Sequence, residues 1–223
     1  MMKYVIAIDG PAAAGKSTVA KRVAKALNIT YIDTGAMYRA FTLYVIEQGI
    51  SPENQTASEA CIPDVHIELK PSGEIYLNNN DVSQAIREPR VSSQVSYIAS
   101  YKAIRLALVD LQRKMADKQS VVMDGRDIGT YVLPEANVKI YQIASVETRA
   151  VRRYEENLEK GIQTSLESVE EELRKRDYID SHRDFAPLKP APDSVLIDTS
   201  FMKVEDVVQR ILDIVQKKTT VGV

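Results

Sequence analysis

Short apolar runs separated by amphipathic stretches make up most of this chain. The first run covers residues 4–8 and ends at Asp9, a pattern typical of a strand buried on both faces of a parallel sheet. From Lys16 to Leu27 apolar residues recur at helical spacing, and residues 29–32 form a second apolar run. A strand, a loop, a helix and a second strand in this order indicate a βαβ unit.

Three more apolar runs predict further buried strands, at residues 121–123, 138–143 and 194–197. Amphipathic patterns precede the first of them, at 104–111, and follow the last, at 207–215. Because strands that alternate with helices are typical of α/β folds, we expect a parallel sheet flanked by helices.

Two segments depart from this alternation. Within residues 60–88, apolar and polar residues alternate at 65–69 and 74–77 on either side of a Lys-Pro-Ser-Gly turn at 70–73. This pattern predicts a hairpin inside a small β-rich insertion. Residues 149–183 are nearly all polar, have a helical pattern, and carry almost equal numbers of basic and acidic side chains.

The composition is that of a globular protein. Hydrophobic residues make up 44% and charged residues 27% of the 223 positions, which excludes extensive disorder. A chain of this length can bury a full core without disulfides. Because no Gly/Ser-rich linker or internal repeat divides the sequence, we expect a single domain, residues 1–223, that carries both insertions.

Charge and residue usage argue against several kinds of partner. Lys and Arg number 29 against 31 Asp and Glu, a net charge of −2, so a general nucleic-acid or anionic-membrane binder is not expected. Cys61 is the only cysteine, and His66 and His182 are far apart in sequence, so neither a disulfide nor a metal cluster is predicted. No apolar run approaches the length of a membrane span, and no signal-peptide pattern opens the chain. We therefore expect a cytoplasmic protein, and a monomer because no apolar stripe requires a partner.

Residues 10–17 match the phosphate-loop pattern G-x-x-x-x-G-K-[ST] between a predicted strand and a predicted helix. In such a loop, backbone N–H groups and the helix N-terminus hold β-phosphate oxygens, Lys16 reaches the β- and γ-phosphates, and the Ser17 hydroxyl ligates Mg²⁺. The alternative is a chance Gly-Lys-Ser turn, against which the flanking elements argue. We expect the left-handed backbone positions to fall on Gly10 and Gly15. The expected ATP-binding residues are Gly10, Pro11, Ala12, Ala13, Ala14, Gly15, Lys16, Ser17 and Thr18.

Residues outside the phosphate loop indicate which class of phosphate-loop protein this chain represents. The D-x-x-G and N-K-x-D strings of GTPase switches do not occur in the sequence. Asp124 ends the apolar run 121–123, which is the position of a Walker B aspartate that supports Mg²⁺. The alternative for Asp124 alone is a carboxylate that caps the end of the strand.

Two arginines come after predicted strands and are expected near the phosphate loop. Arg39 comes after the second strand and Arg126 after the third, and ligands of open α/β sheets bind at the carboxyl ends of strands. We expect both arginines to be unpaired and to bind a second phosphate-bearing substrate, because guanidinium binds phosphate bidentately. The alternative for each is an exposed arginine paired with a surface carboxylate.

The polar segment 149–183 predicts two helices joined around Gly161, each with charged residues on one face. Thr164 and Glu167 fit a capping box that would begin the second helix. Beside a phosphate loop, such a pair is typical of a lid that brings arginines onto a transferring phosphoryl group, whereas the alternative is two solvated helices held by intrahelical ion pairs. The charged faces consist of Arg149, Arg152 and Arg153 on the first helix and Arg176, Asp180 and Arg183 on the second.

Three strings accompany the phosphate loop at residues 10–18, and the second and third of them are far more specific than the loop. Residues 33–39 read D-T-G-A-M-Y-R, residues 124–129 read D-G-R-D-I-G, and residues 176–188 read R-D-Y-I-D-S-H-R-D-F-A-P-L. Together with the β-rich insertion, these strings resemble the motifs of bacterial cytidylate kinases. The resemblance covers essentially the whole chain.

The resemblance implies a P-loop NTPase-type fold with a five-stranded parallel sheet, an insertion that binds the monophosphate, and a helical lid. It also implies transfer of the ATP γ-phosphoryl group to CMP and dCMP, with Mg²⁺ as cofactor. Matched by position, the resemblance assigns catalysis to Lys16, Arg126 and Arg152. It assigns binding of the acceptor's phosphate to Arg39, Arg126 and Arg183, and binding of cytosine to Ser96, Arg105 and Asp127. The ribose would contact Arg176 and Asp180, and Thr34 would lie beside this pocket.

The spacing of Ser96 and Arg105 allows one geometric check. Residues nine apart on one ideal helix face opposite sides, so both can reach cytosine only if the helix breaks between them. We expect the break at Ser100-Tyr101.

Two other functions are left open by the residues themselves. One is a phosphate-loop kinase for another small acceptor, and the other is a nucleotide-binding module without catalysis. The arginine-rich segment 149–183 argues against the second, because a module that only binds nucleotide needs no phosphoryl clamp.

Overall fold

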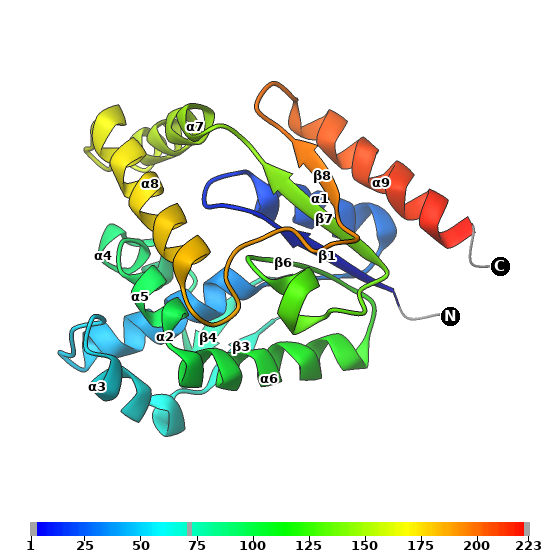
Figure 1. Cartoon of the computed structure of the whole chain (residues 1–223). Helices are drawn as coiled ribbons and strands as arrows, with labels where there is room; N and C mark the ends of the chain where they lie inside the picture. Colours follow the sequence, from blue (N-terminus) through cyan, green and yellow to red (C-terminus); the bar gives the residue numbers. More distant parts are fainter. Residues whose placement is uncertain (1–3, 71–72, 221–223) are drawn as a thin grey trace.

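The central feature of the molecule is a five-stranded parallel sheet, seen in a computed structural model that describes residues 4–70 and 73–220 (Figure 1). The strand order is β2-β6-β1-β7-β8, and every pairing is parallel, so the carboxyl ends of the strands share one edge. All five predicted apolar runs form these strands, and their ends shift by two residues at most. The strands are β1 (Val5–Asp9), β2 (Thr30–Asp33), β6 (Val121–Gly125), β7 (Val138–Ile143) and β8 (Val195–Asp198).

Helices cover both faces of the sheet because the strands are apolar on both sides (Figure 1). On one face, α1 (Lys16–Leu27) and α9 (Val204–Thr220) pack against Ile6 and Ile8 of β1. On the other face, α6 (Lys102–Lys118) and a π-helical turn (Ile128–Val132) pack against the alternate residues of the same strand. The sheet is therefore the middle layer of three.

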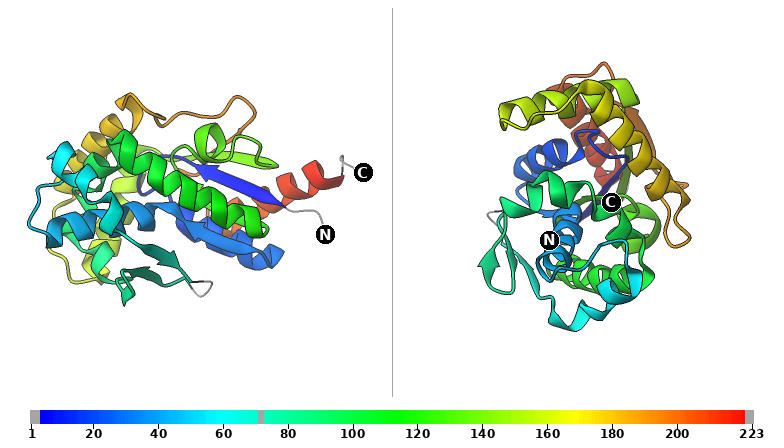
Figure 2. Two further views of the ribbon diagram at one scale, coloured as in Figure 1. Left: turned by 90° about the horizontal axis from the view of Figure 1, so that it is seen from below. Right: turned by 90° about the vertical axis from the view of Figure 1, so that its left-hand side faces the viewer.

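The hairpin predicted within residues 60–88 is confirmed as β3 (Ile67–Leu69) and β4 (Ile75–Leu77), which pair antiparallel. A short β5 (Asn80–Asp81) completes a separate three-stranded sheet, while residues 71–72 of the predicted turn lie outside the described residues. Buried side chains of β3 and β4 share a core with α2 (Thr34–Glu47), so the small sheet packs against the helix that follows β2 (Figure 2).

Short helices flank the small sheet: two lead from α2 to β3, and three lead from β5 to α6. They are α3 (Gln55–Ala60), η1 (Ile62–Asp64), η2 (Ala85–Arg87), α4 (Pro89–Ser92) and α5 (Val95–Ser100). The helix break expected at Ser100-Tyr101 is confirmed, since α5 ends at Ser100 and Tyr101 has extended backbone angles before α6 begins. The break brings the residues on α5 and the first turn of α6 to the same side of the chain.

Two helices, α7 (Val146–Glu159) and α8 (Leu166–His182), lie beyond the carboxyl ends of β1 and β7 (Figure 1). Gly161 lies between them with a positive φ of 70°, as a sharp reversal requires. The predicted capping box is wrong by one residue: Ser165, not Thr164, is the N-cap of α8, and its hydroxyl accepts a hydrogen bond from the backbone N–H of Ser168. Ser165 has the extended backbone angles of an N-cap residue, so the helix begins one residue later than the predicted box requires.

Candidate active site

The carboxyl edge of the sheet, α5 and the α7–α8 pair enclose a cavity of about 790 Å³. Among its lining residues, basic side chains outnumber acidic ones twelve to six, although the chain as a whole carries a net charge of −2. The cavity is therefore suited to anionic ligands. Except for Gly10 and Pro11, every predicted site residue lines it, namely residues 12–18, Thr34, Arg39, Ser96, Arg105, Asp124, Arg126, Asp127, Arg152, Arg176, Asp180 and Arg183.

The phosphate loop begins where β1 ends, and its glycines are needed for different reasons. Gly10 has a φ of 152°, and a Cβ there would lie 1.9 Å from the backbone oxygen of Gln142 on β7, so the close approach leaves no room for a side chain. Gly15 has a φ of 83°. The expectation that left-handed positions fall on the glycines is wrong at Ala13, whose φ is 56°. This conformation costs an L-residue about 1–2 kcal/mol, which the packing of the loop must offset.

Lys16 is buried at the base of this loop. Its Nζ donates a hydrogen bond of 2.6 Å to the Pro11 carbonyl, which folds the lysine back along the loop. Burial, with a further contribution from the charge of Arg126, holds the pKa of Lys16 well below its ordinary value. A bound polyanion would offset both effects, so the ammonium group is poised to gain a partner.

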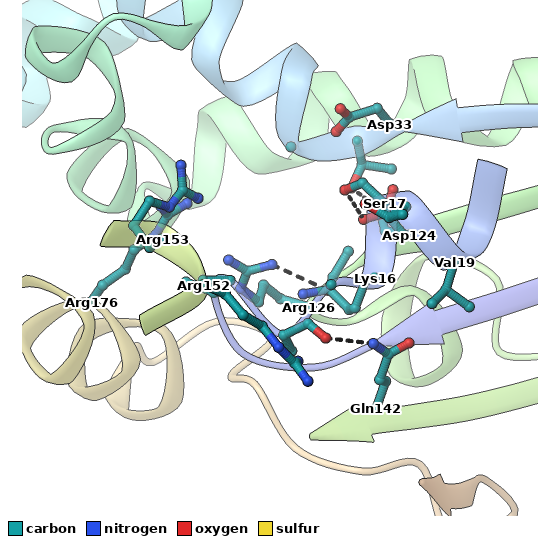
Figure 3. A pocket seen from close by; sticks show the side chains of 18 of the residues that line it. Lys16, Ser17, Val19, Asp33, Asp124, Arg126, Gln142, Arg152, Arg153 and Arg176 are labelled. Carbon is teal, nitrogen blue, oxygen red and sulfur yellow. Dashed lines mark hydrogen bonds between the residues drawn. The ribbon is translucent and has the colours of Figure 1, made fainter. Parts of the chain in front are cut away.

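Gln142 was missed by the sequence argument, although it contacts the loop directly. Its side-chain amide donates to the Ala14 carbonyl, and the residue is 1% exposed. The sequence did offer an indication of this role, because Gln142 is a polar residue inside a strand that was predicted to be buried on both faces. Figure 3 shows Gln142 directed from β7 to the loop that carries Lys16.

The carboxylate of Asp124 is held on both oxygens. One oxygen accepts a hydrogen bond from Ser17 Oγ at 2.9 Å (Figure 3). The other accepts one from the Tyr31 hydroxyl at 2.7 Å. Burial, together with the nearby charge of Asp33, raises the pKa of Asp124. The alternative of a simple strand-end cap does not describe a carboxylate that faces the phosphate loop. Tyr31 was not predicted to take part.

The two arginines expected to be unpaired both have carboxylate partners, so that prediction is wrong. Arg126 Nε donates to Asp180 Oδ2 of α8 at 2.9 Å, and Arg39 lies 3.2 Å from Asp33 Oδ2. Guanidinium groups that line a cavity lose water, and an acid within reach compensates them when no other anion is present. Both side chains still keep part of their surface in the cavity, at 19% for Arg126 and 17% for Arg39.

A buried cluster lies at the α5–α6 end of the cavity. The carboxylate of Asp127 forms ion pairs with Arg105 and, at 3.5 Å, with Arg183. The Arg105 guanidinium also donates to the Ala99 carbonyl and lies over the Tyr38 ring. Ser96 of α5 is buried beside this cluster and lines the same cavity. The cluster therefore presents donors and an acceptor in a fixed arrangement, which is what recognition of a planar polar edge requires.

The α7–α8 pair contributes arginines with different contacts. Arg149 donates to the carbonyls of Ala12 and Ala144 and pairs with Asp177 of α8 at 2.6 Å, so it fastens the helix pair to the phosphate loop. Arg152 lines the cavity, but its guanidinium donates to the Thr199 carbonyl after β8 at 2.7 Å.

Arg176 of α8 lines the cavity with incomplete hydrogen bonding. Its Nε atom is buried with no hydrogen-bond partner among the described residues. Burial, together with the charge of Arg126, lowers the pKa of Arg176 to about 10. Figure 3 shows Arg152, Arg153 and Arg176 on the α7–α8 side of the cavity, opposite Ser17 and Asp124. An anion bound between the two sides would offset the repulsion between the charges of Arg176 and Arg126.

The described residues lack two other kinds of site. No described helix is long and apolar enough to cross a membrane. Within residues 4–70 and 73–220, no group of three or more His, Cys, Asp or Glu residues could hold a metal ion by itself. A cation at Ser17 and Asp124 would therefore need ligands from a bound molecule or from water.

Comparisons with known proteins show the family of this chain. The family model of cytidylate kinase matches residues 6–217. A cytidylate kinase of Anoxybacillus flavithermus is 51% identical over 219 residues, which cover 97% of this chain and 97% of that protein. A cytidylate kinase of Bacillus licheniformis is 50% identical over 220 residues, with the same coverage of both chains.

Among solved structures, an uncharacterized protein from Eubacterium ventriosum matches with a TM-score of 0.54 and 14% sequence identity, covering 97% of this chain and 99% of that chain. At this identity the match reports on the fold alone. The assignment of the family comes from the sequence comparisons.

Proposed function

Because the chain belongs to the cytidylate kinase family, we propose that it transfers the γ-phosphoryl group of ATP to CMP and dCMP, giving ADP and CDP or dCDP in pyrimidine nucleotide metabolism. One observation carries this proposal: a single cavity holds a phosphate loop on one side and buried or half-buried guanidinium groups on the other. Three of these groups have an Nε atom without a partner among the described residues, in Arg39, Arg105 and Arg176. Two phosphate-bearing ligands that meet end to end would satisfy both sides.

The donor would bind at the phosphate loop. Residues 10–18 would hold the β-phosphate through backbone N–H groups at the start of α1, and Lys16 would turn from the Pro11 carbonyl to the β- and γ-oxygens. The exchange replaces a neutral carbonyl by an anion, which strengthens the hydrogen bond of the ammonium group.

The acceptor would bind between α2, α5 and α8. Arg39, Arg126 and Arg183 would hold its phosphate, because their carboxylate partners can be exchanged for phosphate oxygens without loss of charge pairing. Ser96, Arg105 and Asp127 would bind the cytosine edge, and Arg176 and Asp180 the ribose, with Thr34 beside this pocket. We propose that residues 60–88 support this acceptor site through α2, and that residues 149–183 act as a lid.

The chemistry asks for alignment and charge neutralisation more than for proton transfer. The acceptor's phosphate is already ionised at neutral pH, so Asp127 would serve as a binding group and not as a general base. Lys16, Arg126 and Arg152 would offset the charge that spreads over the γ-phosphoryl oxygens. Arg152 would leave the Thr199 carbonyl when the lid closes, and closure would exclude water, which is the competing acceptor.

Mg²⁺ is the expected companion of ATP, and the residues fit it. Ser17 Oγ and an Asp124 oxygen lie 2.9 Å apart at the loop, and hydroxyl and carboxylate oxygens are the ligands that Mg²⁺ prefers. Protein sites of this kind leave the other positions to phosphate oxygens and water. When bound, the ion supplies neutralisation of phosphate charge.

The proposal is tested by measuring ADP release from ATP with CMP, dCMP, UMP and AMP as acceptors. We expect CMP and dCMP to stimulate ADP release far more than UMP or AMP. Titration calorimetry with the same four compounds, without ATP, should rank their affinities in the same order. Binding of ATP with no acceptor-stimulated ADP release would instead identify a nucleotide-binding module, and preference for another acceptor would reject the cytosine assignment.

A further inference from the structure

Asp9 has no part in the chemistry described above, although it is the residue that joins β1 to the phosphate loop. It is 4% exposed, and both of its carboxylate oxygens accept backbone hydrogen bonds from a distant segment. Oδ1 accepts from the N–H of Ile128 at 2.8 Å, and Oδ2 accepts from the N–H of Gly129 at 2.7 Å.

These two N–H groups begin the π-helical turn Ile128–Val132. The first amides of a helical turn have no partner within it and need an outside acceptor. The other end of the turn is held internally, since the Asp127 carbonyl accepts from the N–H groups of Tyr131 and Val132. Asp9 therefore caps this turn from a strand that lies 119 residues earlier in the chain.

The residue that enters the turn is Asp127, which pairs with Arg105 and Arg183 in the cavity. Its backbone is held on both sides, through its own carbonyl by the turn and through the next N–H by Asp9. With the backbone fixed in this way, the carboxylate of Asp127 has little freedom except toward the two guanidinium groups.

The close approach of Asp9 to the turn depends on Gly129. A Cβ at this position would lie 3.4 Å from Asp9 Oδ2 and 3.1 Å from the Lys139 side chain, so a larger residue would press the turn away from Asp9. Because Gly10 follows Asp9 directly, one carboxylate joins the start of the phosphate loop to the turn that carries Asp127.

We propose that Asp9 is a positioning residue that sets the orientation of Asp127 toward the base of the acceptor, acting from the strand that carries the phosphate loop. The inference rests on the proposed function, in which the acceptor is CMP. Removing the cap would let the backbone at Asp127 rotate, and the contact with cytosine would weaken. ATP, which is held by the loop amides, would be affected much less.

A purely structural role for Asp9 predicts something different. Loss of a buried cap alone would lower the stability of the protein, and it would raise KM for both CMP and ATP or for neither. A change in the choice between CMP and UMP requires that the geometry at the base has changed. The ratio of kcat/KM for these two acceptors therefore distinguishes the two roles.

The experiment compares the wild type with Asp9→Asn at pH 8. Burial raises the pKa of Asp9 to about 7, so the wild-type carboxyl is mainly ionised there, and the asparagine turns an NH₂ group toward one of the two N–H donors. We expect KM for CMP to rise and the CMP-to-UMP ratio of kcat/KM to fall, each by about tenfold, with KM for ATP within about twofold of wild type. An unchanged ratio in the folded variant, or an equal rise of KM for both substrates, overturns the proposal.

Two further variants complete the experiment. Asn137→Ala removes the acceptor of the Val5 N–H, a 2.8 Å hydrogen bond at the opposite end of β1, and should lower stability without changing the ratio. In Gly129→Val the methyl groups extend beyond a Cβ that already lies 3.4 Å from Asp9 Oδ2 and 3.1 Å from the Lys139 side chain. They displace the turn while leaving Asp9 in place and should lower the ratio as Asp9→Asn does, which keeps the test decisive if Asp9→Asn does not fold. Wild-type turnover with CMP, measured alongside, tests the proposed function separately.

Discussion

Arg126 and Asp180 form a 2.9 Å hydrogen-bonded ion pair that joins the end of β6 to α8. Burial alone would raise the pKa of Asp180, but the charges of Arg126 and Arg176 outweigh it and hold this pKa below its ordinary value. The carboxylate of Asp180 compensates the positive charge of the Arg126 guanidinium, which lines the cavity. It also links Arg126 to α8, the helix that we assign to the lid. Its exchange for a pairing with the acceptor would couple acceptor binding to movement of α8.

Replacement of Asp180 by asparagine should therefore weaken acceptor binding. The change replaces one carboxylate oxygen of the proposed ribose site by an NH₂ group and removes the negative charge, and charged hydrogen bonds are worth about 1.5–3 kcal/mol. We expect KM for CMP to rise about tenfold or more, with little change in KM for ATP, in steady-state kinetics. The exposed Asp184→Asn is the matched control. A variant that changes KM for ATP alone would contradict the ribose assignment.

Replacement of Lys16 by methionine should abolish turnover while the fold persists. The ammonium group is buried with a lowered pKa, so an apolar side chain of similar length should cost no stability. We expect kcat to fall on the order of a thousandfold, as for the loss of one charged group that stabilises a transition state. Turnover and thermal unfolding should be measured together, with Lys25→Met on the exposed side of α1 as control. Near-normal turnover would refute the role of the phosphate loop.

Arg105 should determine the preference for cytosine over uracil. It is 1% exposed and pairs with Asp127, so Arg105→Met leaves a buried carboxylate with Arg183 as its remaining partner. We expect the CMP-to-UMP ratio of kcat/KM to fall by at least about tenfold. Breaking a buried pair also costs about 3–5 kcal/mol, so Arg105→Lys, which keeps the charge, should be measured beside it. An unchanged ratio in both variants would mean that the base is recognised elsewhere.

Gly10→Ala should disrupt the phosphate loop, because the added Cβ would lie 1.9 Å from the backbone oxygen of Gln142. The comparison with Gly49→Ala separates this clash from the strain of a positive φ. Gly49 also has a positive φ, of 71°, but a Cβ there meets nothing within 4 Å. Calorimetry should show loss of ATP binding by Gly10→Ala and nearly unchanged ATP binding by Gly49→Ala, whose stability should fall by about 1–2 kcal/mol. Equal ATP affinity in both variants would contradict the close-packing argument.

Asp9 should make the protein less stable as the pH rises, whereas most aspartates in folded proteins have the opposite effect. Burial raises its pKa from 3.8 to about 7, against the opposing effect of the Gly129 and Ile128 amides, with smaller contributions from Asp127 and Lys16. Between these pH values the folded state holds a proton that the unfolded state has released, so the contribution of Asp9 is complete below pH 3.8 and is lost as the pH rises through about 7.

The free energy of unfolding, measured by urea titration from pH 4 to pH 8, checks this expectation. As the pH rises, the free energy of unfolding of the wild type should fall relative to that of Asp9→Asn, because Asp9 loses its proton and asparagine does not titrate. A difference that is constant over this range would show that the pKa of Asp9 is not raised.

The sequence by itself determined the elements and the chemistry of the loop. Five apolar runs became the five strands of the sheet. The helix break at Tyr101 was expected from the spacing of Ser96 and Arg105 together with the cytosine contacts that the family resemblance implies for both. These features depend on periodicity and on local backbone preferences, which neighbouring residues largely decide. The Gly-Lys-Ser pattern likewise placed a phosphate loop between β1 and α1.

The tertiary structure alone decided which charges meet. Arg126 was expected to be unpaired, yet its partner Asp180 lies 54 residues later, and the acceptor of the Ile128 amide lies on β1. The left-handed conformation of Ala13, too, is set by the fit of the loop against its surroundings and not by the preference of alanine. Spacing along a chain restricts which neighbours can touch, but desolvation in a shared cavity selects partners by distance in space, and that distance exists only once the layers have packed.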